Sequence, residues 1–292
     1  IDAVSRFIGM FAFGLWDSQS RHLWLVRDRF GVKPLFYAMD SGTVYFASSA
    51  GVIARHLGLR PNLEYLNGGI EFITYERDND ISQFENLHAL PPGHYLRVPA
   101  SRASDAVMRP YYDLGEQVQA LRDELASCSV SDLVERVSQS LQSAITLRLR
   151  SDVPVGISLS GGIDSSTVAA FAVKQLPSLT AFSYGCVTDS FSEGTQVQAV
   201  ADFVGAKVVP AWSTTAEMID ETWETLADQG APFPNTSMVA QHLVFKVARR
   251  NGVIVLLGGQ GGDEALMGYH KFKVFLLREA MRRKDVLATL GL

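Results

Sequence analysis

The 292-residue sequence is poor in cysteine, contains no long apolar run and has no excess of positive charge. Its two cysteines, Cys128 and Cys186, form no CxxC pair, which excludes a disulfide framework and a cysteine metal cluster. The apolar runs are well short of the ~20 residues that cross a bilayer, so we expect no membrane partner. A formal net charge of −5 offers no basic surface to a phosphate backbone, so we expect no nucleic-acid partner. These absences predict a cytoplasmic enzyme.

Two patterns divide the chain. Up to residue 112, short alternating or aromatic runs such as 22–26 and 94–98 are separated by turn residues, which predicts antiparallel strands. After residue 131, short apolar strands near 155–159, 179–184 and 253–257 alternate with helical stretches, which predicts a doubly wound parallel sheet with helices on both faces. We therefore expect a β-rich α+β domain over 1–112, a linker over 113–130 and an α/β domain over 131–292.

The strand near 155–159 leads directly into Ser160-Gly161-Gly162-Ile163-Asp164-Ser165 and then into a helix. Glycines let backbone N–H groups approach a polyanion, and a helix N-terminus adds unpaired donors and partial positive charge. The segment therefore predicts a phosphate cradle. Asp164 would repel phosphate unless a divalent cation bridged the two, which implies Mg²⁺. The same segment is also consistent with a plain turn in which Asp164 and Ser165 cap the helix.

A second glycine-rich loop, Gly258-Gly259-Gln260-Gly261-Gly262-Asp263, follows the strand near 253–257 and precedes another helix. In a doubly wound sheet, loops at the carboxyl ends of strands line one crevice, so we expect both loops to face one ligand. Asp263 would then be a second carboxylate for the cation. The sequence contains neither GxxxxGK[ST] nor GxGxxG, which argues against a Walker-type or dinucleotide-binding site.

The order of these motifs resembles that of glutamine-hydrolysing asparagine synthetases. SGGIDSS is similar to the pyrophosphate motif of ATP pyrophosphatases, and AFSYG and LLGGQGGDEALMGY resemble the synthetase domain of the family. GMFAFGLWD, RDRFGVKPLFYA and LPPGHYL resemble the later half of its glutaminase domain, which has an Ntn-hydrolase fold. The resemblance implies a partial, β-rich glutaminase domain followed by a doubly wound ATP-pyrophosphatase domain, as a fragment truncated at both ends.

The resemblance also implies a reaction and its residues. The family adenylates a carboxylate with ATP and then forms an amide with ammonia from glutamine. Asp164 and Asp263 would bind Mg²⁺ and act in catalysis through it. The residues that would hold pyrophosphate are Ser160, Gly161, Gly162, Asp164 and Ser165, and those that would contact adenosine are Leu159, Tyr184, Gly258 and Gly259. The implied partners are a small carboxylate such as aspartate and, in the full-length protein, glutamine; a homodimer is left open.

Several residues depart from the family pattern. Residue 1 is Ile1 where the glutaminase nucleophile is a cysteine, so we do not expect this chain to hydrolyse glutamine. Gln260 stands in place of a glutamate, and a neutral amide is neither a base nor an anionic ligand. Gly230-Ala231 replaces an Asp-Glu pair. The last two changes favour an acceptor other than aspartate.

Three alternatives to asparagine synthesis follow. One is a paralogue that amidates a sugar uronic acid in surface-polysaccharide synthesis, and another is an ATP pyrophosphatase that closes a lactam or ring without glutamine-derived ammonia. The third is an inactive truncated paralogue, which the presence of both Asp164 and Asp263 disfavours.

Other polar residues are expected to be structural. Arg27, Asp28, Arg29 and Lys33 are predicted to form a solvated or interface cluster without a catalytic role. The six histidines show no metal-binding spacing, so we expect them to have ordinary hydrogen-bond partners.

Overall fold

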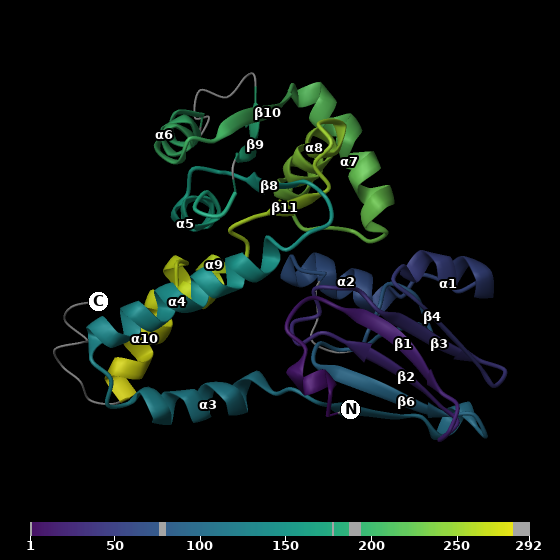
Figure 1. Ribbon diagram of the computed structural model, residues 1–292. Helices are drawn as coiled ribbons and strands as arrows, with labels where there is room; N and C mark the ends of the chain where they lie inside the picture. The colour runs from purple at the N-terminus through teal and green to yellow at the C-terminus, as the bar shows by residue number, and fades with distance from the viewer. Residues whose placement is uncertain (1, 76–79, 177, 187–193, 283–292) are drawn as a thin grey trace. The chain divides into compact units, whose positions relative to one another are not determined.

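The computed structural model describes residues 2–75, 80–176, 178–186 and 194–282 and divides the chain into two compact units (Figure 1). The first unit comprises 1–129 and 223–236, and the second comprises 130–222 and 237–292. The segment predicted as a linker, 113–130, contains helix α3 (Leu114–Leu125). Ile1 and residues 283–292, at the two ends of the predicted domains, lie outside the described residues.

The first unit contains two antiparallel sheets. One has the order β1-β2-β6-β7 and is formed by β1 (Ala12–Asp17), β2 (His22–Arg27), β6 (His94–Pro99) and β7 (Val107–Pro110). The other has the order β4-β3-β5 and is formed by β3 (Phe36–Asp40), β4 (Thr43–Ala47) and β5 (His88–Ala89). Helices α1 (Ala50–Leu57) and α2 (Leu63–Phe72) follow β4, and the short helical turns η1 (Val4–Arg6) and η2 (Ala103–Asp105) precede β1 and β7. The predicted β-rich α+β character is confirmed.

Asp28, which directly follows β2, is a buried structural residue. Asp28 is only 1% exposed, and its carboxylate accepts four backbone N–H bonds at 2.9–3.3 Å, from Phe11, Phe30, Val32 and Lys33. The guanidinium of Arg27 donates to three backbone carbonyls at 2.7–2.8 Å. These bonds replace the water that buried charges lose. The expectation of a solvated cluster is therefore wrong for Arg27 and Asp28.

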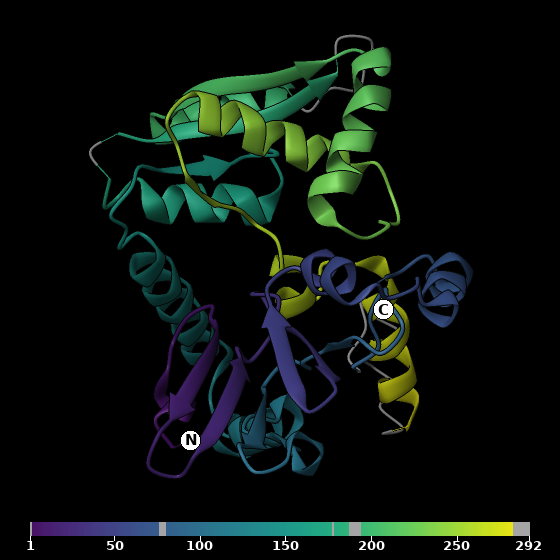
Figure 2. The same ribbon diagram turned by 90° about the vertical axis from the view of Figure 1, so that its right-hand side faces the viewer.

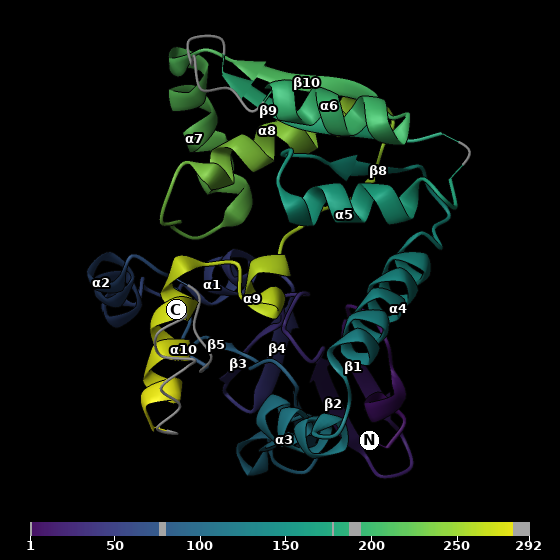
Figure 3. The same cartoon turned by 90° about the vertical axis from the view of Figure 1, so that its left-hand side faces the viewer.

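The second unit is a parallel sheet between helices, as predicted. Its strands have the order β10-β9-β8-β11 and are β8 (Val155–Ser158), β9 (Thr180–Cys186), β10 (Lys207–Ser213) and β11 (Val255–Leu257). Helices α5 (Ile163–Ala172) and α6 (Gly194–Val204) lie on one face (Figure 3), and α8 (Ser237–Arg250) lies on the other (Figure 2). The remaining helices of this unit are α4 (Val130–Arg148), α9 (Gly262–Leu266) and α10 (His270–Arg282), and α7 (Thr215–Gln229) is divided between the two units at residue 222.

Side chains of β9 alternate between the two faces of this sheet. Ala181 belongs to a buried cluster with Ile157 and Ala169, on the side of α5. The next residue, Phe182, belongs to a second buried cluster with Val244, on the side of α8. This alternation buries both faces, which is typical of a parallel sheet covered by helices.

The strand order reverses beside β8. From β8 the chain continues to β9 and β10 on one side, and it later returns to place β11 on the other side. In open α/β sheets, ligands bind at such a reversal, outside the carboxyl ends of the strands. The two glycine-rich loops follow β8 and β11, so the fold places both of them at the reversal.

Candidate functional site

The loop after β8 is held by contacts with its own residues and with α6. The Oγ atoms of Ser160 and Ser165 lie 3.1 Å apart, and Ser165 Oγ accepts the N–H of Ser160 at 3.3 Å. Gly161 has a φ of +79°, and a Cβ there would lie 2.8 Å from the Cβ of Gln196. A side chain at this position would therefore be both strained and obstructed. Glycine is the residue that allows this course of the loop.

The N-terminus of α5 has no side-chain cap among the described residues. Gly162 is the N-cap residue, and the hydroxyl of Ser165 contacts Ser160 instead. Backbone N–H groups of the first turn therefore remain available to a ligand, and the helix dipole favours an anion. This arrangement argues against the alternative in which Asp164 and Ser165 only cap the helix.

Asp164 is the point at which the two loops meet. Its carboxylate is half-buried and has no hydrogen-bond or ion-pair partner in the described part of the chain. A Cβ on Gly259 would lie 2.6 Å from the backbone nitrogen of Ser165 and 2.8 Å from Asp164 Cβ, and a Cβ on Gly262 would overlap the Asp164 carboxylate. The loops therefore pack directly on each other, with glycine at both contacts.

Further acidic residues lie near this point on α9. The hydroxyl of Tyr269 donates to Glu264 Oε1 at 3.1 Å, and this bond raises the pKa of Tyr269. The negative charges of Asp263 and Asp164 raise the same pKa further, so both carboxylates are close enough to act on Tyr269. Asp263 itself is half-buried, with its carboxylate against Gly268.

The acidic residues suit a cation that is shared with a ligand. Within the described residues, no group of three or more His, Cys, Asp or Glu side chains could hold a metal ion. Mg²⁺ commonly takes one or two carboxylates and completes its coordination with water and phosphate oxygens. Asp164 and Asp263 fit that pattern, whereas a metal centre formed by protein ligands alone does not fit.

A cavity of about 250 Å³ adjoins the loop after β8. Three of the predicted nucleotide residues line it: Leu159, Ser160 and Tyr184. The Tyr184 hydroxyl is fixed by Ser213 Oγ at 3.0 Å. Gln260, which the sequence analysis singled out on the second loop, also lines it, and the remaining lining residues were not predicted: Ser158, Ser183, Ser237, Met238, Ala240, Gln241 and Val244. None of these described lining residues carries a charge.

The unpredicted residues of this cavity come mainly from α8. Ser237, Gln241 and Val244 follow one another at helical spacing along that helix. In the sequence, this spacing could have indicated that these α8 residues share one face of an amphipathic helix and can line a cavity together. The predicted residues Gly161, Gly162, Asp164, Ser165, Gly258, Gly259 and Asp263 lie outside the cavity lining, in the two loops and at the starts of α5 and α9.

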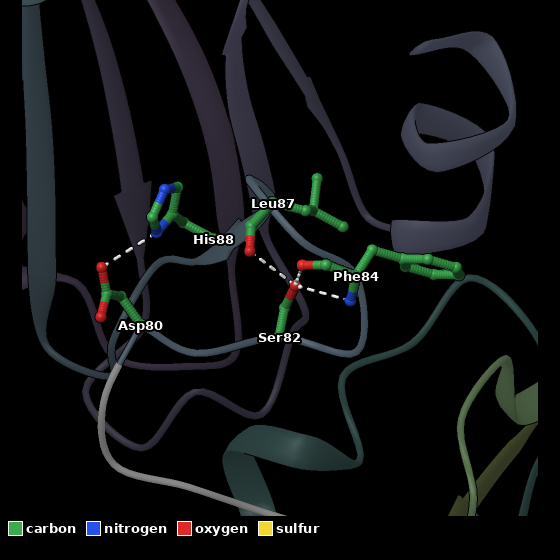
Figure 4. Close-up of polar contacts among 5 residues, drawn as sticks. All are labelled: Asp80, Ser82, Phe84, Leu87 and His88. Carbon is green, nitrogen blue, oxygen red and sulfur yellow. Dashed lines mark hydrogen bonds and ion pairs between the residues drawn. The ribbon is translucent and has the colours of Figure 1, made fainter. Parts of the chain in front are cut away.

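A serine, a histidine and an aspartate also occur together in the first unit (Figure 4). His88 Nδ1 lies 3.0 Å from Asp80 Oδ2. The hydroxyl of Ser82, however, donates to the carbonyl of Leu87 at 2.7 Å, and Ser82 is 1% exposed. A serine nucleophile needs a hydrogen bond to the histidine and access to substrate, so this trio is not a catalytic triad.

Two of the other histidines also have ordinary hydrogen-bond partners. His242 Nδ1 lies 2.6 Å from Glu221 Oε1, and His94 Nδ1 lies 2.7 Å from the carbonyl oxygen of Pro92. His22 is the exception, because its buried Nδ1 has no hydrogen-bond partner among the described residues. The expectation of satisfied histidines therefore fails at His22.

Comparison with known proteins relates these features to a family. A model of asparagine synthase matches residues 136–288. The chain belongs to the asparagine synthase family. A model of the glutamine amidotransferase domain also matches residues 1–112. The resemblance inferred from the motifs is thus confirmed.

Individual relatives in the asparagine synthase family are distant. The chain is 28% identical over 274 residues to glutamine-hydrolyzing asparagine synthetase 1 of Bacillus subtilis, with 93% of this chain and 41% of the relative covered. It is 28% identical over 291 residues to amidase chry2 of Gibberella zeae, with 94% and 42% covered. It is 30% identical over 275 residues to a putative asparagine synthetase of Methanocaldococcus jannaschii, with 92% and 51% covered. The chain therefore spans about two fifths to one half of the length of these relatives.

Proposed function

We propose that this chain is the ATP-binding part of a carbon–nitrogen ligase that adenylates a carboxylate and converts it to an amide. Asp164 is the observation that carries the proposal. Its half-buried carboxylate, which has no partner among the residues that the structure describes, lies against Gly259 and Gly262, next to the N-terminus of α5, where those residues provide no side-chain cap. Donors for phosphate and a ligand for a cation thus occur within one helical turn. Membership of the asparagine synthase family supports this class of enzyme.

In this proposal, the nucleotide lies across the carboxyl ends of the strands. Its pyrophosphate part would be held by the backbone and hydroxyl groups of the loop and first turn, from Ser160, Gly161, Gly162 and Ser165. Its adenosine part would occupy the cavity beside Leu159 and Tyr184, with Gly258 and Gly259 at the ribose end. A cavity lined by uncharged side chains suits a neutral nucleoside, whereas the helix N-terminus suits the charged phosphates.

Asp164 and Asp263 would hold Mg²⁺. When bound, the ion would offset the charge that develops on departing pyrophosphate. The N–H groups of α5 and the hydroxyls of Ser160 and Ser165 would donate to the same oxygens, which stabilises pyrophosphate as a leaving group. The substrate carboxylate attacks the α-phosphorus of ATP and pyrophosphate leaves. Ammonia, with glutamine as its source in the full-length protein, then displaces AMP from the acyl adenylate.

The identity of the acceptor carboxylate depends on the uncharged residues of the site. Gln260 lines the cavity, and its carboxamide is neither a base nor an anionic ligand. Relatives of this chain carry the names amidase and asparagine synthetase, so membership of the family does not by itself select aspartate. We propose an acceptor other than aspartate, with sugar uronic acids as the first class to test.

The experiment is ATP–pyrophosphate exchange by the full-length protein, with aspartate and a series of uronic acids supplied in turn. Exchange that depends on a uronic acid would support the proposed acceptor. Exchange driven by aspartate alone would contradict the inference from Gln260 while retaining adenylation. No exchange with any carboxylate, by protein that binds ATP, would contradict adenylation of these acids.

A further inference from the structure

We propose that Gln241 reads the base of the bound nucleotide and selects a 6-aminopurine. This inference rests on the proposed nucleotide function of the cavity. It adds a specificity residue from α8, outside both glycine-rich loops.

Gln241 is placed to contact a ligand. It is half-buried and lines the cavity between Ser237 and Val244. Its carboxamide has no hydrogen-bond partner in the parts of the chain that the structure describes. A half-buried amide that loses water without gaining a partner is destabilising, and a ligand that supplies the partner removes that penalty.

The position of α8 assigns Gln241 to the base rather than to the phosphates. Helix α8 packs on β9 and β10 (Figure 2). The two glycine-rich loops follow β8 and β11, which are the other two strands in the order β10-β9-β8-β11. A nucleotide with its phosphates at those loops therefore directs its base toward α8. Gln260 lines the same cavity, but it lies on the loop whose Gly259 packs on Asp164, so we place it nearer to the ribose and phosphates than Gln241.

The chemistry of the carboxamide matches adenine. It offers one acceptor oxygen and an NH₂ donor. The 6-amino group and N7 of adenine form the complementary pair, and glutamine binds this edge with two hydrogen bonds. Guanine presents two acceptors at the same edge and cannot satisfy the carboxamide oxygen.

The test compares two nucleotides in two proteins. Calorimetry in the presence of Mg²⁺ would measure the affinities of ATP and of purine riboside triphosphate, which lacks the 6-amino group. We expect the wild type to bind ATP about tenfold more tightly than the analogue, since a good bidentate pair discriminates by that order. Gln241→Met keeps the length of the side chain and removes both polar groups, so it should bind the two nucleotides about equally.

Two further variants keep the test decisive. Gln142→Leu alters an exposed glutamine of α4 and should retain the tenfold preference. Gln241→Glu keeps an acceptor for the 6-amino group and should retain part of the preference, even if Gln241→Met does not fold. An equal preference for ATP in the wild type and in both Gln241 variants would overturn the role of Gln241 and leave ATP binding intact. Failure of the wild type to bind either nucleotide would instead contradict the proposed function.

Discussion

Two aspartates differ in how their charge is satisfied, and this difference underlies the role proposed for Asp164. Asp28 is buried with four backbone N–H donors around its carboxylate, so its charge is satisfied by the chain itself. Asp164 is half-buried without a hydrogen-bond or ion-pair partner among the described residues. Because an unpaired charge is costly to desolvate, it persists where a ligand provides the partner. The difference in partners, rather than the residue type, is the reason for proposing a functional role for Asp164 and a structural role for Asp28.

The glycines of the second loop give a matched pair of variants. A Cβ on Gly259 would lie 2.6 Å from the backbone nitrogen of Ser165, whereas a Cβ on Gly258 would have its nearest neighbour at 3.8 Å. Gly259→Ala should therefore lower the free energy of unfolding by roughly 1–3 kcal/mol through overpacking, and Gly258→Ala should change it much less. Chemical denaturation of both variants measures this difference. Equal stabilities would show that the two loops do not pack as described.

Individual helices and strands differ in whether the sequence alone predicts them. The motif formed by β8, the glycine-rich loop and α5 was predicted because its strand, turn and helix follow one another directly in the sequence. Helix α2 was not predicted, since its Gly68-Gly69 pair is typical of a turn. In the structure Gly69 lies against the ring of Tyr75, which a side chain would displace, so a tertiary contact overrides the local propensity.

The junction between the ends of β2 and β7 should be sensitive to high pH. Tyr111 donates its hydroxyl to the carbonyl of Arg27 at 2.7 Å, and burial, followed by the charge of Asp28, raises its pKa from 10.0 to about 12. The folded state therefore favours the neutral phenol. Its contribution to stability is complete below pH 10 and is lost as the pH rises toward 12.

The free energy of unfolding should consequently fall between about pH 10 and pH 12, and the fall should be smaller in Tyr111→Phe. Denaturant titrations across this range measure both proteins. Burial, with the charge of Asp80, also raises the pKa of Tyr37 to about 12, so part of the fall should remain in the variant. An identical pH dependence in the two proteins would contradict the assignment to Tyr111.

For the molecule as a whole, the alternation of strands and helices was enough to predict the parallel sheet. Together with the order of the motifs, it also indicated which loops to examine. The strand order β10-β9-β8-β11 then explains why those loops share one place, because the reversal lies between the strands that carry them. The place of Gln241 in the cavity lining could not be predicted in this way. It depends on how α8 packs across β9 and β10, which is a property of the assembled unit and not of a local motif.

No helix in the described ranges of the chain is long and apolar enough to span a bilayer. Cytoplasmic location, the homodimer and the absence of a nucleic-acid partner stay predictions.

The central claim is that Asp164 and the two glycine-rich loops form one Mg²⁺-dependent ATP site. Calorimetry of ATP binding, with and without Mg²⁺, tests it most directly in the wild type, Asp164→Asn and the control Asp152→Asn, which alters an exposed aspartate of the same unit. We predict Mg²⁺-dependent binding in the wild type and the control, and affinity reduced on the order of 100-fold in Asp164→Asn, in line with the loss of a charged ligand contact of about 3 kcal/mol. Equal ATP affinity in Asp164→Asn and the wild type would contradict the claim.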